Sequence, residues 1–179
     1  MIPTEQSDFP PMSTTLKHLL AGGDDSRFRK TIYGLLSVSA MMLRTRELYG
    51  SYIGISAPQY TILMVIAEES ETTVGHLAAT LHTSGPFITS EVNKLVALDL
   101  VSKRPNENDR RSTLLELTKA GRDRIYKVSP MRTAANDIIF GSLNPAEAEM
   151  LQHLVNILNR DFEKAVHMLE GPEWKARAD

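Results

Sequence analysis

The spacing of apolar residues along this chain predicts mostly helices. Apolar side chains recur three or four residues apart, which is the pattern of a helix that buries one face. The predicted long helices cover residues 26–49, 119–139 and 145–168, and a shorter one begins after Ser56. Pro130 falls within the second pattern, so that helix is expected to kink or break there.

Helix-capping residues flank these patterns. Asp24, Asp25 or Ser26 can cap the first helix, and Gly50 and Gly54 are expected to end it. Ser56 is placed to cap the second helix, and Thr118 the helix that begins at Lys119. The last helix starts with Asn144, Pro145 and Glu147, an arrangement resembling a capping box.

The middle of the chain, residues 72–117, has a different organisation. Two short helices are predicted first, and Ser84 can cap the second of them. That helix carries an apolar stripe formed by Ile88, Val92, Leu95 and Val96. Its opposite face is small, polar and uncharged to basic, and consists of Pro86, Phe87, Ser90, Asn93 and Lys94. Such a face after a tight turn suits the DNA major groove, where Asn and Lys can bond base edges.

A β-ribbon is predicted directly after this helix. Residues 101–104 and 113–117 are short strand-like runs, separated by the turn-rich sequence PNENDRRS. Arg110 and Arg111 lie at the tip, where their guanidinium groups can enter a minor groove of negative potential. Asp109 can hold one of these guanidinium groups in place through a bidentate pair.

This combination resembles the winged helix-turn-helix of the multiple-antibiotic-resistance-regulator (MarR) family. The matching motifs lie within about residues 56–121: Ser56-Ala57-Pro58-Gln59-Tyr60, Leu77-Ala78, Ile88-Thr89, Leu100-Val101, Arg104, Asp109-Arg110-Arg111 and Leu117-Thr118-x-x-Gly121. Asp99 is a departure, since the family more often has Gly before Leu-Val. The resemblance implies a mainly α fold with a small β-wing, and a DNA-contacting set that also includes Thr83 and Ser84.

The predicted organisation has five parts. These are an irregular N-terminal arm (1–25), a dimerisation helix (26–55), a winged helix-turn-helix domain (56–118), C-terminal dimerisation helices (119–170) and a tail (171–179). The flanking helices carry more apolar surface than the small DNA-reading core can cover, so a homodimer is expected. Two-fold symmetry would place two recognition helices about 34–36 Å apart on an inverted-repeat, palindromic operator in double-stranded DNA.

Composition narrows the class of protein. The 179 residues include no cysteine, which excludes disulfides and thiolate metal sites and fits a cytoplasmic protein. The chain has no apolar run near the roughly 20 residues that span a bilayer, and no secretory signal is predicted. The five histidines lack metal-ligand spacing, and neither a phosphate loop nor a nucleophile elbow is present. We therefore expect no enzyme, cofactor or metal site.

The charge distribution supports DNA binding although the net charge is −2. The segment from Lys103 to Lys127 contains eight Lys or Arg residues and four acidic residues. The segment from Ala135 to Asp179 contains eight acidic residues and four basic ones. A basic edge on an acidic body is the distribution that electrostatic steering toward DNA requires. Chance clustering on a solvated face is the alternative explanation for this pattern.

The resemblance also implies a small effector, often phenolic or anionic, bound between the dimer region and the DNA-reading lobe. The residues expected to line that pocket are Met42, Arg46, Tyr49, Tyr60 and Met64, and Arg46 could pair with an aromatic carboxylate. For each of them, ordinary core or dimer packing is the competing explanation. The sequence thus predicts a ligand-responsive repressor; the alternative is a winged-helix protein-interaction module without sequence-specific DNA binding.

Overall fold

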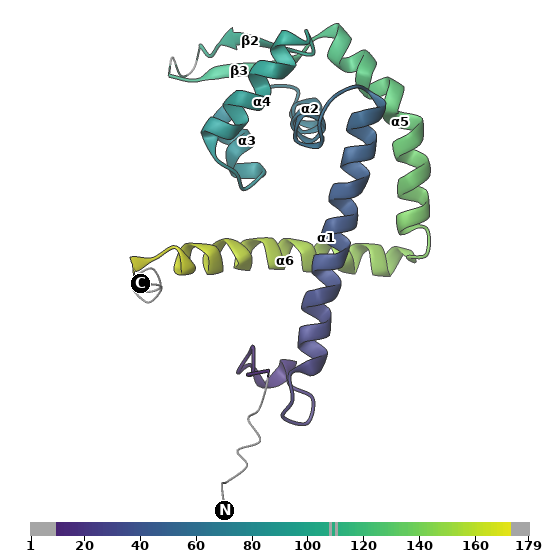
Figure 1. The fold of residues 1–179 in the computed structure, drawn as a ribbon, viewed down its shortest axis with the longest axis vertical. Helices are drawn as coiled ribbons and strands as arrows, with labels where there is room; N and C mark the ends of the chain where they lie inside the picture. Colours follow the sequence, from purple (N-terminus) through teal and green to yellow (C-terminus); the bar gives the residue numbers. More distant parts are fainter. Residues whose placement is uncertain (1–9, 108, 110, 173–179) are drawn as a thin grey trace, which may run out of the picture. The chain divides into compact units, whose positions relative to one another are not determined.

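The computed structural model describes residues 10–107, 109 and 111–172, and they fall into two compact units that divide between Val128 and Ser129. In the first, three helices and the sheet gather near one end of a long helix (Figure 1). Its elements are η1 (Lys17–Leu19), α1 (Ser26–Tyr52), α2 (Ala57–Glu69), β1 (Thr72–Thr73), α3 (Val74–Thr80), α4 (Gly85–Ala97), β2 (Val101–Pro105), β3 (Thr113–Leu117) and the start of α5 (Lys119–Phe140).

The first helix is longer than the sequence predicts. It continues through Gly50 to Tyr52, and Gly54, with φ of +75°, follows its end. Gly50 is not a terminator, because it is buried and a Cβ there would lie 2.7 Å from the Ile55 carbonyl oxygen. It is glycine because the chain entering α2 packs directly against the helix backbone.

The cap of α2 is the one that the sequence predicts. The Ser56 side chain accepts a hydrogen bond from the Gln59 backbone N–H, and the Gln59 side chain accepts one from the Ser56 N–H at 3.0 Å. This reciprocal capping box fixes the start of α2 and orients Gln59 inward. The apolar face of α2 then supplies much of the core, together with α3, α4 and the sheet. The fully buried side chains of these elements include Ile62, Leu63, Ile66, Leu77, Ile88, Val92, Leu95 and Leu115.

The sheet has a third strand that the sequence analysis did not anticipate. The strand order is β1-β3-β2, and both pairings are antiparallel, with Thr72 opposite Leu115 and Lys103 also opposite Leu115. A two-residue strand is too short to show an alternating pattern. It is formed by tertiary pairing with β3, and its Thr73 side chain also caps α3.

Asp99 and Gly121 meet at the junction between α4, the sheet and α5. Asp99 has φ of +56°, in the left-handed region, which Asp tolerates better than most residues. Thr118 Oγ1 donates to the Asp99 carbonyl at 2.6 Å and accepts from the Gly121 N–H at 3.0 Å. A Cβ at position 121 would lie 2.1 Å from the Leu100 carbonyl oxygen, so the two backbones touch there.

The chain before α1 is attached to it by a buried carboxylate. Asp25 is the N-cap residue, but its side chain makes no capping hydrogen bond. It accepts hydrogen bonds from Ser13 N–H and Ser13 Oγ, both at 2.6 Å, and it pairs with Arg29. Asp25 is only 1% exposed. Its carboxylate therefore holds the segment around Ser13 against the start of α1 and does not cap the helix.

The second unit contains the end of α5 and the helix α6 (Pro145–Leu169). The sequence predicts a kink or a break at Pro130; helix α5 continues through Pro130, so it does not break there. A proline removes one backbone hydrogen bond, and the bonds on either side suffice to keep the helix. Asn144 and Glu147 form the predicted capping box at the start of α6.

Helix α6 buries none of its residues. Its exposed apolar side chains recur at helical spacing and form one stripe, which contains Leu151, Leu154, Val155, Leu158 and Phe162. No helix within the described part of the chain is long and apolar enough to cross a membrane.

Candidate nucleic-acid interface

Helix α4 has one buried and one exposed face. Ser84 caps it by accepting from the Phe87 N–H at 3.3 Å, and a tight turn with His82 at φ of +47° precedes it. The predicted stripe is buried except at Val96, which is partly exposed. The side chains expected to read DNA are exposed (Pro86, Phe87, Ser90, Asn93 and Lys94), and Thr83 in the turn is partly exposed. The helix therefore presents the polar surface that the sequence analysis described.

One acid on α4 was missed by sequence reasoning. Glu91 is buried and accepts hydrogen bonds from Gln59 Nε2 at 3.0 Å and from Lys94 Nζ at 2.6 Å. Because Gln59 belongs to the capping box of α2, this network links the start of α2 to α4. A signal was available, since an acid at position 91 interrupts the apolar stripe between Ile88 and Leu95.

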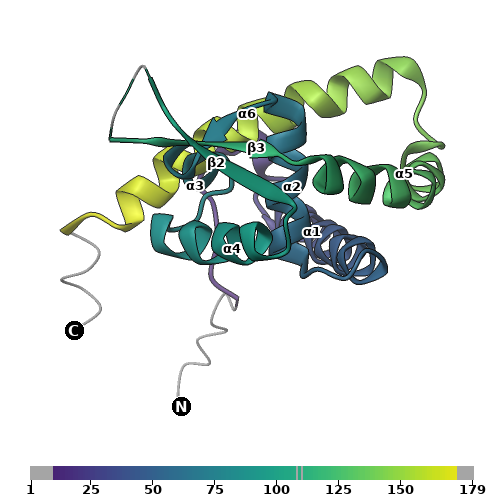
Figure 2. The same cartoon turned by 90° about the horizontal axis from the view of Figure 1, so that it is seen from above.

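Asn93 is bonded to a residue of the neighbouring strand. Its Oδ1 accepts a hydrogen bond from Lys103 Nζ at 2.6 Å. Helix α4 runs alongside the β2–β3 hairpin that carries Lys103 (Figure 2). Lys103 is exposed, so it adds an ammonium group to the exposed face of α4.

The β2–β3 hairpin, residues 101–117, is the wing. Asp109 Oδ1 accepts a hydrogen bond from the Arg111 backbone N–H at 3.0 Å, and its carbonyl accepts one from the Ser112 N–H at 2.9 Å. The carboxylate thus shapes the turn through the backbone, as short acidic side chains do in Asx turns. Arg111 is exposed. Arg110, and with it the predicted pairing between its guanidinium group and Asp109, lies outside the described residues.

Arg104 joins the wing to the loop before β1. Its guanidinium group forms ion pairs with Glu71 and with Glu116 on β3. The hydrogen bond to Glu116, and then the charges of the two acids, hold the pKa of Arg104 above its usual value. These ion pairs orient the base of the wing. They also balance the charge of Arg104, so this residue has less charge available for DNA than the arginine near the tip of the wing.

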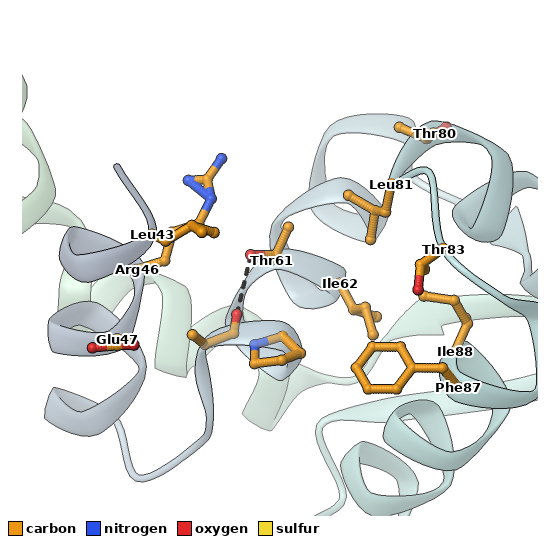
Figure 3. Close-up of a pocket in the computed structure, with 12 residues that line it drawn as sticks. Leu43, Arg46, Glu47, Thr61, Ile62, Thr80, Leu81, Thr83, Phe87 and Ile88 are labelled. Carbon is orange, nitrogen blue, oxygen red and sulfur yellow. Dashed lines mark hydrogen bonds between the residues drawn. The ribbon is translucent and has the colours of Figure 1, made fainter. Parts of the chain in front are cut away.

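A pocket of about 600 Å³ lies between α1, α2 and the helix-turn-helix. Figure 3 shows Arg46 on the α1 side, and Leu81, Thr83 and Phe87 on the other. Its floor is mainly apolar, and Thr61 Oγ1 donates to the Ala57 carbonyl at 3.0 Å within it. Arg46 is half-buried and makes no ion pair with any residue that the structure describes.

The other residues expected to bind a ligand do not line this pocket. Tyr49 and Tyr60 are buried, and their ring centroids lie 5.4 Å apart. Met42 is exposed on α1, and Met64 is half-buried on α2. The residues expected from the sequence lie on α1 and α2, which both contribute to the pocket, but only the folded arrangement shows which side chains of these helices line it.

Residues 53–112 match the sequence model of the MarR family, and no curated protein matches the chain. Among solved structures, the fold is similar to AbsC, a MarR family transcriptional regulator from Streptomyces coelicolor (21% identity, 76% of this chain and 94% of that chain, TM-score 0.67). It is also similar to a mutant MarR from E. coli complexed with operator DNA (22%, 72% and 95%, TM-score 0.56). A MepR-like protein complexed with pseudoligands matches at 25% identity (72% and 92%, TM-score 0.54). Residues 53–112 therefore carry the sequence pattern of the MarR family, and the chain has the winged helix-turn-helix fold of MarR family transcriptional regulators.

Proposed function

We propose that this protein is a DNA-binding transcriptional regulator that uses α4 as its recognition helix and the wing as its minor-groove contact. The observation that carries the proposal is the exposed, polar face of α4 beside a wing that bears Arg111 at its tip. A helix of this kind fits the major groove, and an adjacent arginine is attracted by the potential of the minor groove.

The regulator acts as a homodimer on an inverted-repeat operator. The exposed apolar stripe of α6, and the exposed apolar residues of α1, support this part of the proposal. An apolar stripe that stays exposed along a whole helix is typical of a protein interface rather than of a monomer's surface. The segments 26–55 and 119–170 are the proposed dimerisation regions, and 56–118 is the proposed DNA-binding domain.

A small anionic effector controls DNA binding from the pocket beside Arg46. The apolar floor suits an aromatic ring, and Arg46 has no anionic partner among the described residues. An aromatic carboxylate satisfies both features through ring burial and a charge-assisted hydrogen bond. Because Thr83 and Phe87 also line the pocket, an occupant touches the turn and the first residues of α4 directly.

The first experiment is a titration of the purified protein against DNA fragments from around its own gene, at several salt concentrations. We expect one fragment to bind far more tightly than bulk DNA, with an affinity that falls steeply with salt. Equal binding to every fragment, or none, would contradict the proposal and favour a winged-helix protein-interaction module.

The second experiment tests the effector. Aromatic carboxylates are screened for an increase in melting temperature and for release of the bound fragment, using wild type and Arg46→Ala. We expect active compounds to lose most of their effect in Arg46→Ala while the variant still binds DNA. Arg44→Ala is the matched control, because Arg44 lies on the same helix, pairs with Glu47 and does not line the pocket. Equal responses of the two variants would remove Arg46 from the proposal.

A further inference from the structure

We infer that Asn93 and Lys103 act as one donor-only reading pair that selects guanine over adenine in the major groove. The inference rests on the proposed DNA-binding function and goes beyond it by naming a base preference and by assigning a role to a residue of the β2 strand.

The orientation of the Asn93 side chain is fixed by chemistry. Its amide has an accepting oxygen and a donating nitrogen, whereas the ammonium group of Lys103 only donates. The 2.6 Å contact to Lys103 Nζ must therefore use Oδ1, which leaves Nδ2 as the atom that faces outward. The strand holds Lys103 in place through its register opposite Leu115, whose side chain is buried.

This orientation changes what Asn93 can recognise. A free Asn reads adenine through two bonds, donating to N7 and accepting from the N6 amino group. In this protein the accepting atom is already bonded to an ammonium group, and the positive charge repels a second donor such as the adenine amino group. Guanine presents two acceptors at the same edge, N7 and O6, and both are attracted by Nδ2 and by the remaining N–H groups of Lys103.

The neighbouring Lys94 does not supply the same chemistry. Its ammonium group donates to the buried carboxylate of Glu91 at 2.6 Å, and the two side chains lie one turn apart on α4. The charge of Lys94 is partly balanced by this acid, whereas Lys103 is paired only with a neutral amide among the contacts of the described residues. Of the two lysines, Lys103 is therefore the one whose charge no carboxylate of the described residues balances, and it forms the reading pair with Asn93.

The experiment is a selection of bound sequences from a random pool of duplex DNA, followed by titrations against the selected operator with single-base changes. Four proteins are compared: wild type, Lys103→Met, Lys103→Arg and Lys119→Met. Lys103→Met removes the donor and frees Asn93 Oδ1, whereas Lys103→Arg keeps both charge and donors. Lys119→Met removes the same charge from an exposed lysine that pairs with Asp123 and does not contact Asn93.

We expect wild type and Lys103→Arg to favour guanine at one position of each half-site by roughly tenfold over adenine. In Lys103→Met this preference falls or reverses toward adenine, whereas Lys119→Met weakens binding to all sequences alike. Two further proteins, Asn93→Ala and the double variant Asn93→Ala/Lys103→Met, test the coupling. The effects of the two substitutions on the base profile should not add, because Asn93 and Lys103 read the base as one pair.

Two results distinguish a failure of the proposed reading pair from a failure of the DNA-binding proposal. If Lys103→Met binds the operator with the base profile of wild type, the reading pair is wrong and the DNA-binding proposal stands. If wild type enriches no sequence from the pool, the DNA-binding proposal fails and the reading pair fails with it.

Discussion

Helices α4 and α6 have the same kind of amphipathic pattern and opposite surroundings. The stripe of α4 is buried at Ile88, Val92 and Leu95, each with no exposed surface. The longer stripe of α6 buries nothing, and Leu154 and Phe162 remain 47% and 55% exposed. A periodic stripe predicts that a helix will bury one face, and it does not say whether the partner belongs to the same chain. Helix α4 packs against α2 and the sheet, whereas α6 buries none of its residues within the described part of its unit.

The strongest way to break this comparison is to charge the stripe of α6. In Leu154→Arg/Leu158→Arg we expect loss of the dimer and of most specific DNA binding, because a buried unpaired charge opposes association. Analytical ultracentrifugation should give a mass near the 19.9 kDa of one chain. Asn156→Arg is the control, since Asn156 lies on the same helix outside the stripe. A dimer that survives the double change would refute α6 as the interface.

Leu95 tests whether the buried stripe of α4 contributes to the core. Leu95→Ala should lower the free energy of unfolding by about 2–5 kcal/mol, because it leaves a cavity under the recognition helix. Leu98→Ala, at the C-cap of α4 and 48% exposed, should change it by less than about 0.5 kcal/mol. Urea denaturation of both variants at one fixed protein concentration measures the difference. Similar values for the two would mean that α4 does not contribute to the core as described.

Glu91 is the one buried polar side chain of α4, and it tests how much a polar contact adds to the apolar packing of this helix. Glu91→Ala leaves the amide of Gln59 without its acceptor, and we expect a loss of about 1–3 kcal/mol of stability. Glu91→Gln keeps an acceptor for Gln59 and should recover part of this loss. Thermal denaturation followed by circular dichroism distinguishes the two. If both substitutions are neutral, the link between α2 and α4 has no energetic role.

The last prediction concerns the outward surface of α4 and the wing, where substitutions should change DNA binding and leave the core intact. Arg111→Ala should weaken binding to all DNA sequences and reduce the salt slope by about one. Ser90→Ala should instead change the preference among operators, by about 1–3 kcal/mol if Ser90 contacts a base edge. Salt titrations with the operator and with unrelated DNA separate the two effects. A sequence-dependent change in Arg111→Ala would assign the arginine to base reading rather than to the backbone.

The sequence predicted most of the elements because their signals are local. Ser56, Ser84 and Asn144 cap the helices expected of them, and the two wing strands lie within one residue of the expected bounds. The errors arose where tertiary contacts decide. The sequence pattern predicts a helix end at Gly50, whereas in the structure this glycine lies within α1 and permits close packing against Ile55.

The candidate site was less predictable than the fold. The exposure of the polar face of α4 follows from helical periodicity, so that face could be named in advance. The contact between Asn93 and Lys103 joins residues ten positions apart through the packing of α4 on β2, and no sequence period encodes it. The pocket beside Arg46 combines four helices, so its other lining residues depend on how those helices pack.

The close contact at Gly121 limits which amino-acid substitutions the chain can accept at that position. A side chain of any size at that position would overlap the Leu100 carbonyl, in a backbone that also carries the turn at Asp99. Most helical positions accept many residues, but this one accepts none besides glycine without separating α5 from the end of the DNA-reading lobe. In a saturation-mutagenesis library, almost all functional variants should therefore keep glycine at position 121. The neighbouring positions Lys119 and Arg122 should accept many different residues. Gly121 is thus explained by a steric limit on mutation, and it marks the place where two segments of backbone touch.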